Sequence, residues 1–279
     1  MPFFKLFRPL LVVVAILGHA AETHAADEIF WYRDLKQASN VAQEAGRPIF
    51  IDFWADWCTP CKAMDSQVYS NPKVIEAFKR KLVGVRLNFD LQRETARKFN
   101  VWGLPHLVFT NSYGTPLISH RGFMAAQDLA NVVDAIPPLE EINSLDRRLQ
   151  QNKDDLATVL AMGRALGAAG FFESSKLYYD RAARHSGART DPTVRESILY
   201  EQALNLLELR DSKQAAGILE ICLKEFSTSV RKPEFLLALA RSYVMSGLTG
   251  KARVSLNSIL SDYPESTAAN QARVVLKSL

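Results

Sequence analysis

The residues whose type and spacing best suit chemistry are two cysteines three positions apart, Cys58 and Cys61. They follow the short apolar run Ile49–Trp54, which is typical of a buried strand, and they begin a stretch with helical spacing. The unpaired N–H groups and the dipole at a helix N-terminus favour a thiolate at Cys58. Cys61, one helical turn further on, could then break a disulfide between Cys58 and another molecule. The pattern therefore predicts dithiol/disulfide exchange, with Cys58 as the nucleophile and Cys61 as the resolving residue.

The second step of such an exchange needs a base, because the Cys61 thiol must lose its proton before it attacks. Asp52 is the exception inside the apolar run, where a carboxyl group would be buried. Burial raises the pKa of a carboxyl group and lets it exchange protons near neutral pH. We therefore predict that Asp52 is the proton acceptor.

The cysteine pair could instead be half of a zinc site, since structural zinc usually takes four Cys or His ligands. The chain has one further cysteine, Cys222, and five histidines without ligand spacing. Cys222 lies between Ile221 and Leu223 in a helical pattern, which favours a small buried apolar residue over a third redox partner. We expect no metal and no cofactor apart from the Cys58–Cys61 disulfide itself.

A strand end, a helix start and a buried carboxyl must be brought together by the surrounding elements. Apolar runs alternate with helical patterns up to about residue 136, and the turn at residues 112–114 separates the last two runs. Strands separated by helices, then a hairpin and a last helix, indicate an α/β fold with a mixed sheet covered on both faces. We expect helices at 31–44, 58–68, 72–79, 93–99 and 125–133, and strands at 49–54, 82–89, 107–110 and 117–120.

A different architecture begins after Pro137 and Pro138, where the pattern becomes helical throughout. Residues 215–226 resemble residues 252–263 at a fixed offset, and Gly170 matches Gly247 in a looser, earlier copy. Such pairs of antiparallel helices are similar to tetratricopeptide-type repeats, in which each pair buries its apolar stripe against its neighbours. An irregular helical bundle without a binding groove is the alternative.

The first residues are typical of an export signal, with Lys5 and Arg8 ahead of the apolar run Leu10–Leu17. The run is shorter than the ~20 residues of an ordinary membrane span, so we expect cleavage, with an uncleaved anchor as the alternative.

A formal net charge of +4 without a basic stripe argues against nucleic-acid binding. The predicted parts are a signal peptide at 1–26, an α/β domain at 27–136, a linker or first helix at 137–152 and helical repeats at 153–279.

The segments Phe53–Lys62 and Asn100–Phe109 resemble the thioredoxin family, and the resemblance extends over about residues 28–136. It implies a thioredoxin-like fold in which Asp52 is the buried aspartate of the family. It also implies that Pro105 is a cis proline that helps to hold an extended substrate strand beside the disulfide. The supporting residues implied by the resemblance are Trp57, Pro60, Lys62 and Leu104.

Two positions depart from the usual family pattern, and a third bears on Asp52. Thr59 replaces a glycine between the cysteines and could alter access to the disulfide and its potential. His106 replaces the threonine after the cis proline; it could tune the thiolate or pack under the loop, and we favour packing. Arg86 stands where a lysine is common, and its permanent charge would keep Asp52 ionised if the two side chains are close.

Within the family, residues 70–74, 101–105 and 121–124 are most similar to the C-terminal periplasmic domain of transmembrane thiol-disulfide interchange proteins. That similarity implies a periplasmic, reducing oxidoreductase that acts on protein thiols and disulfides and receives electrons from a membrane-bound donor. The helical repeats would dock a protein partner. Two alternatives stay open, a repeat-based or chaperone-like scaffold with a secondary redox role, and an oxidant that forms disulfides.

Overall fold

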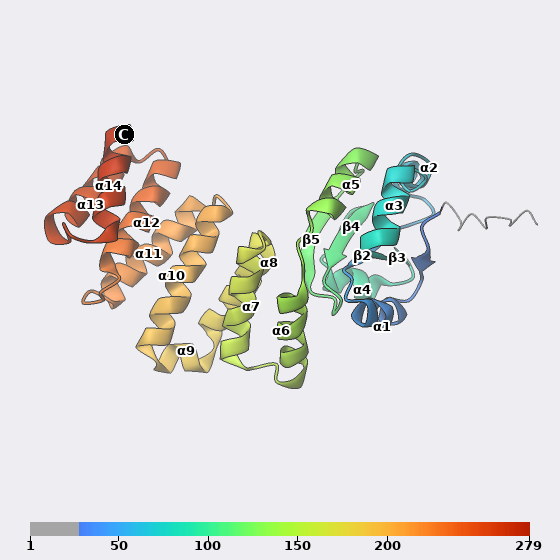
Figure 1. The fold of residues 1–279 in the computed structure, drawn as a ribbon, viewed down its shortest axis with the longest axis horizontal. Helices are drawn as coiled ribbons and strands as arrows, with labels where there is room; N and C mark the ends of the chain where they lie inside the picture. Colours follow the sequence, from blue (N-terminus) through green and yellow to red (C-terminus); the bar gives the residue numbers. More distant parts are fainter. Residues whose placement is uncertain (1–27) are drawn as a thin grey trace, which may run out of the picture.

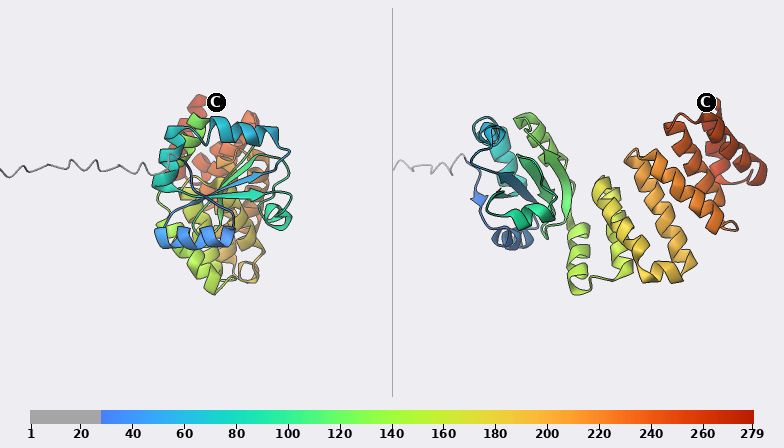
Figure 2. Two further views of the ribbon diagram at one scale, coloured as in Figure 1. Left: turned by 90° about the vertical axis from the view of Figure 1, so that its right-hand side faces the viewer. Right: turned by 180° about the vertical axis from the view of Figure 1, so that it is seen from behind.

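The computed structural model describes residues 28–279, so the predicted export signal lies outside the described residues. Two regions follow one another in Figure 1, a five-stranded sheet with helices and then an array of helices that leads away to the C-terminus. The right panel of Figure 2 shows the same succession from behind, and the left panel looks along the molecule with the sheet region in front of the helices. The predicted combination of a mixed α/β sheet and a helical second half is confirmed.

The sheet has the strand order β1-β3-β2-β4-β5, which makes β2 its central strand. β2 pairs in parallel with β3 and antiparallel with β4. β1 is parallel to β3, whereas β4 and β5 form an antiparallel hairpin. The strands are β1 (Trp31–Tyr32), β2 (Ile49–Trp54), β3 (Val83–Asn88), β4 (His106–Thr110) and β5 (Pro116–Arg121).

Alternation along β2 divides the core of the sheet into two layers, because successive side chains in a strand point to opposite faces. Ile49, Ile51 and Phe53 pack with α1 (Leu35–Ala45) and α4 (Arg93–Lys98) on one face. Phe50 belongs to the layer on the other face. The helices of that second layer are α2 (Thr59–Gln67), α3 (Pro72–Lys81) and α5 (Ala126–Ala135).

The helix predicted from residue 31 is wrong for its first residues, because Trp31 and Tyr32 form β1. They pair with Gly84 and Val85 of β3, a contact between distant segments that no local periodicity reports. α1 begins only after Asp34, whose side chain accepts a hydrogen bond from the backbone N–H of residue 37 at 2.7 Å and caps the helix. The other predicted elements of the sheet region agree with the structure to within two residues at each end.

After β5 the described residues contain helices only. Gly170 and Gly247 precede α8 and α13 with φ of +82° and +73°, so the matched glycines occupy equivalent left-handed turns. The helices are α6 (Glu140–Gln151), α7 (Leu156–Ala168), α8 (Phe172–Arg184), α9 (Ser186–Thr190), α10 (Pro192–Glu208), α11 (Ser212–Glu225), α12 (Lys232–Met245), α13 (Thr249–Asp262) and α14 (Thr267–Ser278).

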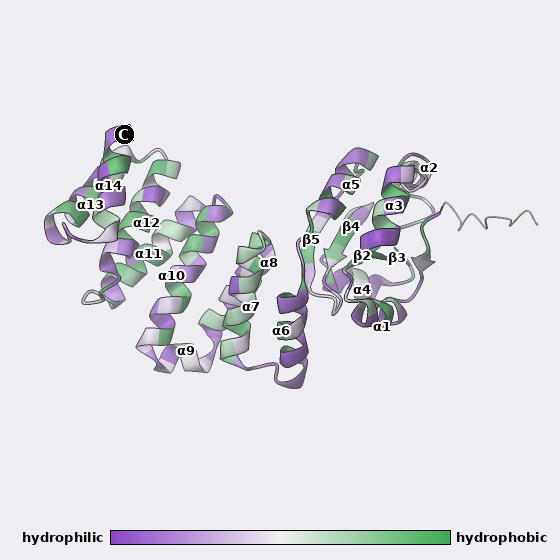
Figure 3. Ribbon diagram, in the orientation of Figure 1, coloured by the Kyte–Doolittle hydropathy of each residue, from purple (hydrophilic) through white to green (hydrophobic). Residues whose placement is uncertain are grey.

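One hydrophobic core continues from the sheet into the first helices of the array. Phe109 and Leu117 of the hairpin share a cluster with Leu166 of α7 and Tyr179 of α8. α6 is largely hydrophilic in Figure 3, and its apolar side chains are buried in the same cluster. The Ser174 hydroxyl of α8 donates to the carbonyl of Pro116 at 2.6 Å, which helps to cover the edge strand β5. The boundary at residues 136 and 137 stays a prediction, since the core crosses it.

Candidate functional site

Cys58 and Cys61 form a disulfide at the junction between β2 and α2. β2 ends at Trp54, and Cys58 is the N-cap of α2, with Pro60 in the first turn. The backbone N–H of Cys61 donates to the Cys58 sulfur at 3.2 Å. Both cysteines are nearly buried, with exposed fractions of 3% and 1%. The helix start therefore directs a backbone donor at the sulfur that would carry the charge of a thiolate.

The loop before β4 lies against the disulfide. Leu104 packs on the cluster formed by Ala55 and the two cysteines. The peptide bond between Leu104 and Pro105 is cis. The carbonyl of Pro105 accepts a hydrogen bond from the backbone N–H of Gly122 at 2.8 Å, which ties this loop to the end of β5.

Asp52 lies in the middle of β2 and is 1% exposed. Its carboxylate accepts a hydrogen bond from Arg86 Nε at 3.0 Å, and Arg86 also pairs with Asp65 of α2 at 2.8 Å. Burial raises the pKa of Asp52 to about 6, against the opposing effect of the Arg86 guanidinium. Sequence reasoning missed the cage around this guanidinium, which is made by the rings of Trp31, Trp54 and Tyr69.

The geometry links Asp52 to the cysteines through Trp54. The two residues are two positions apart in β2 and point to the same face of the sheet. Trp54 packs against the cysteine cluster. Asp52 is thus a buried carboxyl group on the disulfide side of the sheet, and its raised pKa suits it to take up and release a proton near neutral pH.

The supporting residues differ in exposure. Trp57 is 64% exposed, and its indole N–H donates to Asp90 at 2.7 Å, which fixes the ring beside the cysteine turn. Asp90 is held in turn by Arg93 at 2.9 Å. Pro60 and Lys62 lie on the exposed side of α2. The supporting roles of Trp57, Pro60 and Lys62 stay predictions.

His106 lies on the sheet face opposite Asp52. It pairs with Phe53 in the register of β2 and β4, and its ring meets the Phe53 ring edge-on. Its Nε2 forms a hydrogen bond of 2.7 Å with the Ser119 hydroxyl. Burial and the neighbouring charges of Arg121 and His120 lower the pKa of His106. These contacts support the packing role that we favour for His106. They place its ring on the sheet face opposite Asp52.

Three exposed side chains near the loop received no role from the sequence. Trp102 precedes Leu104, and Arg121 and Phe123 flank the glycine that bonds to Pro105. The Arg121 guanidinium stacks on the Trp102 ring at 3.2 Å from its centroid. The signal that could have indicated them is the presence of two aromatic residues and a cation in the segments on either side of the β4–β5 hairpin.

Cys222 is free and buried in α11, and burial raises the pKa of its thiol to about 12. A thiol of that pKa is unreactive at neutral pH, in agreement with a buried apolar residue. Within residues 28–279 no group of three or more His, Cys, Asp or Glu side chains could hold a metal ion.

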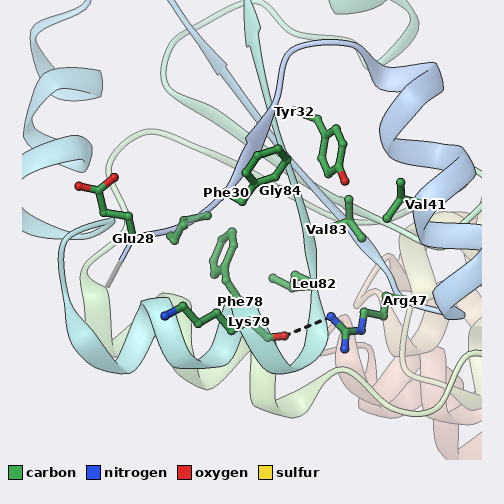
Figure 4. Close-up of a pocket in the computed structure, with 11 residues that line it drawn as sticks. Glu28, Phe30, Tyr32, Val41, Arg47, Phe78, Lys79, Leu82, Val83 and Gly84 are labelled. Atoms are coloured by element: carbon green, nitrogen blue, oxygen red, sulfur yellow. Dashed lines mark hydrogen bonds between the residues drawn. The ribbon is translucent and has the colours of Figure 1, made fainter. Parts of the chain in front are cut away.

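A cavity of about 370 Å³ lies away from the disulfide. Figure 4 shows its lining, which includes Phe78 and Leu82, and the hydrogen bond of 3.1 Å from Arg47 to the carbonyl of Lys79. Arg47 precedes β2, whereas the cysteines follow it, so the cavity and the disulfide lie at opposite ends of this strand.

The matches to known proteins fall separately on the sheet region and on the helical array. Residues 30–112 match the family described as thioredoxin-like, and residues 234–266 match the tetratricopeptide repeat. Thioredoxin 1 of Chlorobaculum tepidum is 44% identical over 61 residues, which are 22% of this chain and 57% of that protein.

Thiol:disulfide interchange proteins DsbD are also similar. The protein of Campylobacter jejuni is 33% identical over 120 residues, or 41% of this chain and 20% of that protein. The protein of Yersinia pestis is 36% identical over 98 residues, or 33% of this chain and 16% of that protein. The matches therefore span about a fifth of these relatives or less.

A solved thioredoxin from Thermus thermophilus is 23% identical over 38% of this chain and 85% of its own, with a TM-score of 0.35. The family matches fall on the two regions that the structure separates by architecture, the disulfide-bearing sheet and the helical array. The chain thus joins a thioredoxin-like domain to a helical region that contains a tetratricopeptide repeat.

Proposed function

We propose that this protein is an extracytoplasmic thiol-disulfide oxidoreductase that reduces disulfides of other proteins. The observation that carries the proposal is the Cys58–Cys61 disulfide at the N-terminus of α2, packed against the loop of Leu104 and Pro105. Similarity to thioredoxin and to DsbD proteins supports the same chemistry.

The proposed reaction has two displacement steps. The reduced Cys58 thiolate attacks a substrate disulfide, forms a mixed disulfide and releases one substrate thiolate. Cys61 then gives its proton to Asp52 and attacks the Cys58 sulfur, which closes the protein disulfide and releases the second substrate thiolate. Two electrons pass from the protein to the substrate, and an external dithiol must return them before the next cycle.

The location, the direction and the partners are parts of the proposal. The export signal that we predict at residues 1–26 supports an exported protein, and the thiol:disulfide interchange named for the DsbD relatives supports exchange with another dithiol. We propose that this electron donor is bound to the membrane. Among residues 28–279 no helix is long and apolar enough to cross a membrane. We assign the helical array to docking of a protein partner, which its tetratricopeptide repeat supports.

The deciding measurement is the reduction potential of the Cys58–Cys61 couple in the chain without residues 1–26, equilibrated with dithiothreitol or glutathione. We expect a value near or below about −270 mV, as for thioredoxin, whereas a value near about −120 mV would identify an oxidant.

Trapping of mixed disulfides gives a second test of the chemistry. Cys61→Ser should accumulate mixed disulfides with protein substrates through Cys58, and Cys58→Ser should not; equal capture by both variants would favour a scaffold.

A further inference from the structure

The stacked side chains of Trp102 and Arg121, named the Trp–Arg pair here, form an exposed cationic feature at the loop of Leu104 and Pro105. Trp102 is 68% exposed, so its ring lies at the surface and not in the core. The guanidinium carbon of Arg121 lies 3.2 Å from the ring centroid, and this stacking holds the charge in one place at the surface.

The backbone connects the Trp–Arg pair to the loop that packs on the redox centre. Leu104, which packs on the cysteines, is two residues after Trp102. Arg121 is the last residue of β5 and is followed by Gly122, which donates to the carbonyl of Pro105. A Cβ at Gly103 would approach the Arg121 side chain to 3.0 Å, so the glycine leaves room for the arginine over the loop.

The charge of Arg121 is not neutralised by the part of the chain that the structure describes. Arg86 and Arg93, the other arginines near the site, are paired with Asp65 and Asp90. Arg121 forms no ion pair with any residue from 28 to 279, and its neighbours His106 and His120 supply no negative charge. A held cation without a partner attracts an anion brought to the same place.

We infer that the Trp–Arg pair makes the site prefer substrate segments with an acidic residue beside the reactive cysteine. The inference rests on the proposed exchange and adds a substrate class to it. In the mixed disulfide the substrate cysteine is bonded to Cys58, so the residues next to it in the substrate run past the loop. An Asp or Glu there can pair with Arg121, and the exposed rings of Trp57 and Phe123 offer apolar contact to its neighbours.

The experiment uses pre-reduced protein and two symmetric peptide disulfides, in which Glu or Lys flanks the single cysteine. The release of peptide thiol gives a second-order rate constant for each, and the readout is the ratio of the Glu to the Lys peptide. Arg121→Gln should lower this ratio roughly two- to fivefold, the size of one exposed charge pair. Arg121→Lys should keep most of the wild-type ratio, and high salt should lower the ratio of the wild type. Because the ratio is compared between variants, differences in the intrinsic reactivity of the peptides cancel.

The matched control is Arg253→Gln, which removes the same charge from an exposed position on α13 and should leave the ratio as in the wild type. Trp102→Ala should lower the ratio in the same direction as Arg121→Gln, because the guanidinium loses the ring that holds it. A ratio that Arg121→Gln leaves unchanged would overturn the preference while the exchange activity stands. Failure of the wild type to reduce either peptide would overturn both the preference and the proposed function.

Discussion

Asp52 is held between two opposing influences. Burial disfavours its charge, and the Arg86 guanidinium at 3.0 Å favours it. The balance leaves the pKa at about 6, so the carboxylate predominates at neutral pH while protonation stays accessible. That state suits the proton transfer that we assign to this residue, and it also makes the stability of the domain depend on pH.

Replacement of Asp52 by Asn should change that pH dependence. The pKa is about 6 in the folded protein against an ordinary value of 3.8, so the folded state holds an extra proton between these values. The free energy of unfolding therefore falls as pH rises through this window. Asp52→Asn does not titrate and so does not lose this stability. Its free energy of unfolding minus that of the wild type should therefore rise by up to about 3 kcal/mol between pH 3.5 and 7.

Urea unfolding at several pH values measures this difference, with exposed Asp262→Asn on α13 as the control that should leave the pH profile unchanged. Parallel profiles for the wild type and Asp52→Asn would show that Asp52 does not titrate in this range.

The helical elements repeat their turns as well as their helices. Gly170 and Gly247 adopt left-handed backbone angles before α8 and α13, and Arg210 adopts φ of +59° before α11. The same turn is therefore built twice with glycine and once with arginine. An L-residue in this conformation costs roughly 1 kcal/mol relative to glycine.

Arg210→Gly should accordingly raise the free energy of unfolding of the helical array by about 0.5–1 kcal/mol. Thermal unfolding followed by circular dichroism at 222 nm would detect the gain. Arg253→Gly, placed inside α13 where the backbone is helical, should instead lower stability by about 1 kcal/mol. Equal destabilisation by Arg210→Gly and Arg253→Gly would contradict this expectation.

At the tip of the β4–β5 hairpin, Asn111 connects the sheet to α6. Its side-chain oxygen accepts hydrogen bonds from the backbone of Tyr113 and Thr115 at 3.0 and 2.9 Å. Its amide donates to the carboxylate of Asp146, whose pKa is raised by burial. Asn111 is fully buried, so no water replaces these bonds.

Asn111→Ala should lower the free energy of unfolding by about 2 kcal/mol or more, because it removes a hydrogen-bond donor to the buried carboxyl of Asp146 and the acceptor of two backbone N–H groups. Asn40→Ala, an exposed change on α1, should stay within about 0.5 kcal/mol of the wild type. Similar urea midpoints for the two variants would mean that the hairpin contact with α6 adds little.

On the scale of the whole molecule, the thioredoxin-like domain and the first helices of the array share one core. Residues of the hairpin and of α6, α7 and α8 are buried together, whereas α13 and α14 pack with α12 in a separate cluster. All four tryptophans lie at or before residue 102, so their fluorescence reports the sheet region alone. This arrangement allows the coupling between the two regions to be measured directly.

Removal of residues 137–279 should lower the stability of the tryptophan-reported transition by roughly 2 kcal/mol or more, the scale of uncovering one or two large apolar side chains. Removal of residues 249–279, which deletes α13 and α14, should leave that transition unchanged. The two truncations can be compared by fluorescence during urea unfolding. Equal midpoints for both truncations and the full chain would show that the shared core does not couple the regions.

Local signals in the sequence were sufficient where the chain decides its own conformation. The apolar run of β2 and the cysteine spacing at the start of α2 depend on neighbours within a few residues, and these predictions agree with the structure. The two glycines matched between the repeats occupy equivalent turns. The role of Pro105 came from resemblance and stays a prediction.

Tertiary structure alone decided the features built from distant segments. β1 exists because Trp31 and Tyr32 meet β3, and the pKa of Asp52 depends on Arg86 of that same strand. The Trp–Arg pair forms only where the loop before β4 meets the end of β5. Periodicity and spacing record what a residue's neighbours along the chain require, whereas burial, ion pairing and stacking depend on which segments the fold brings together.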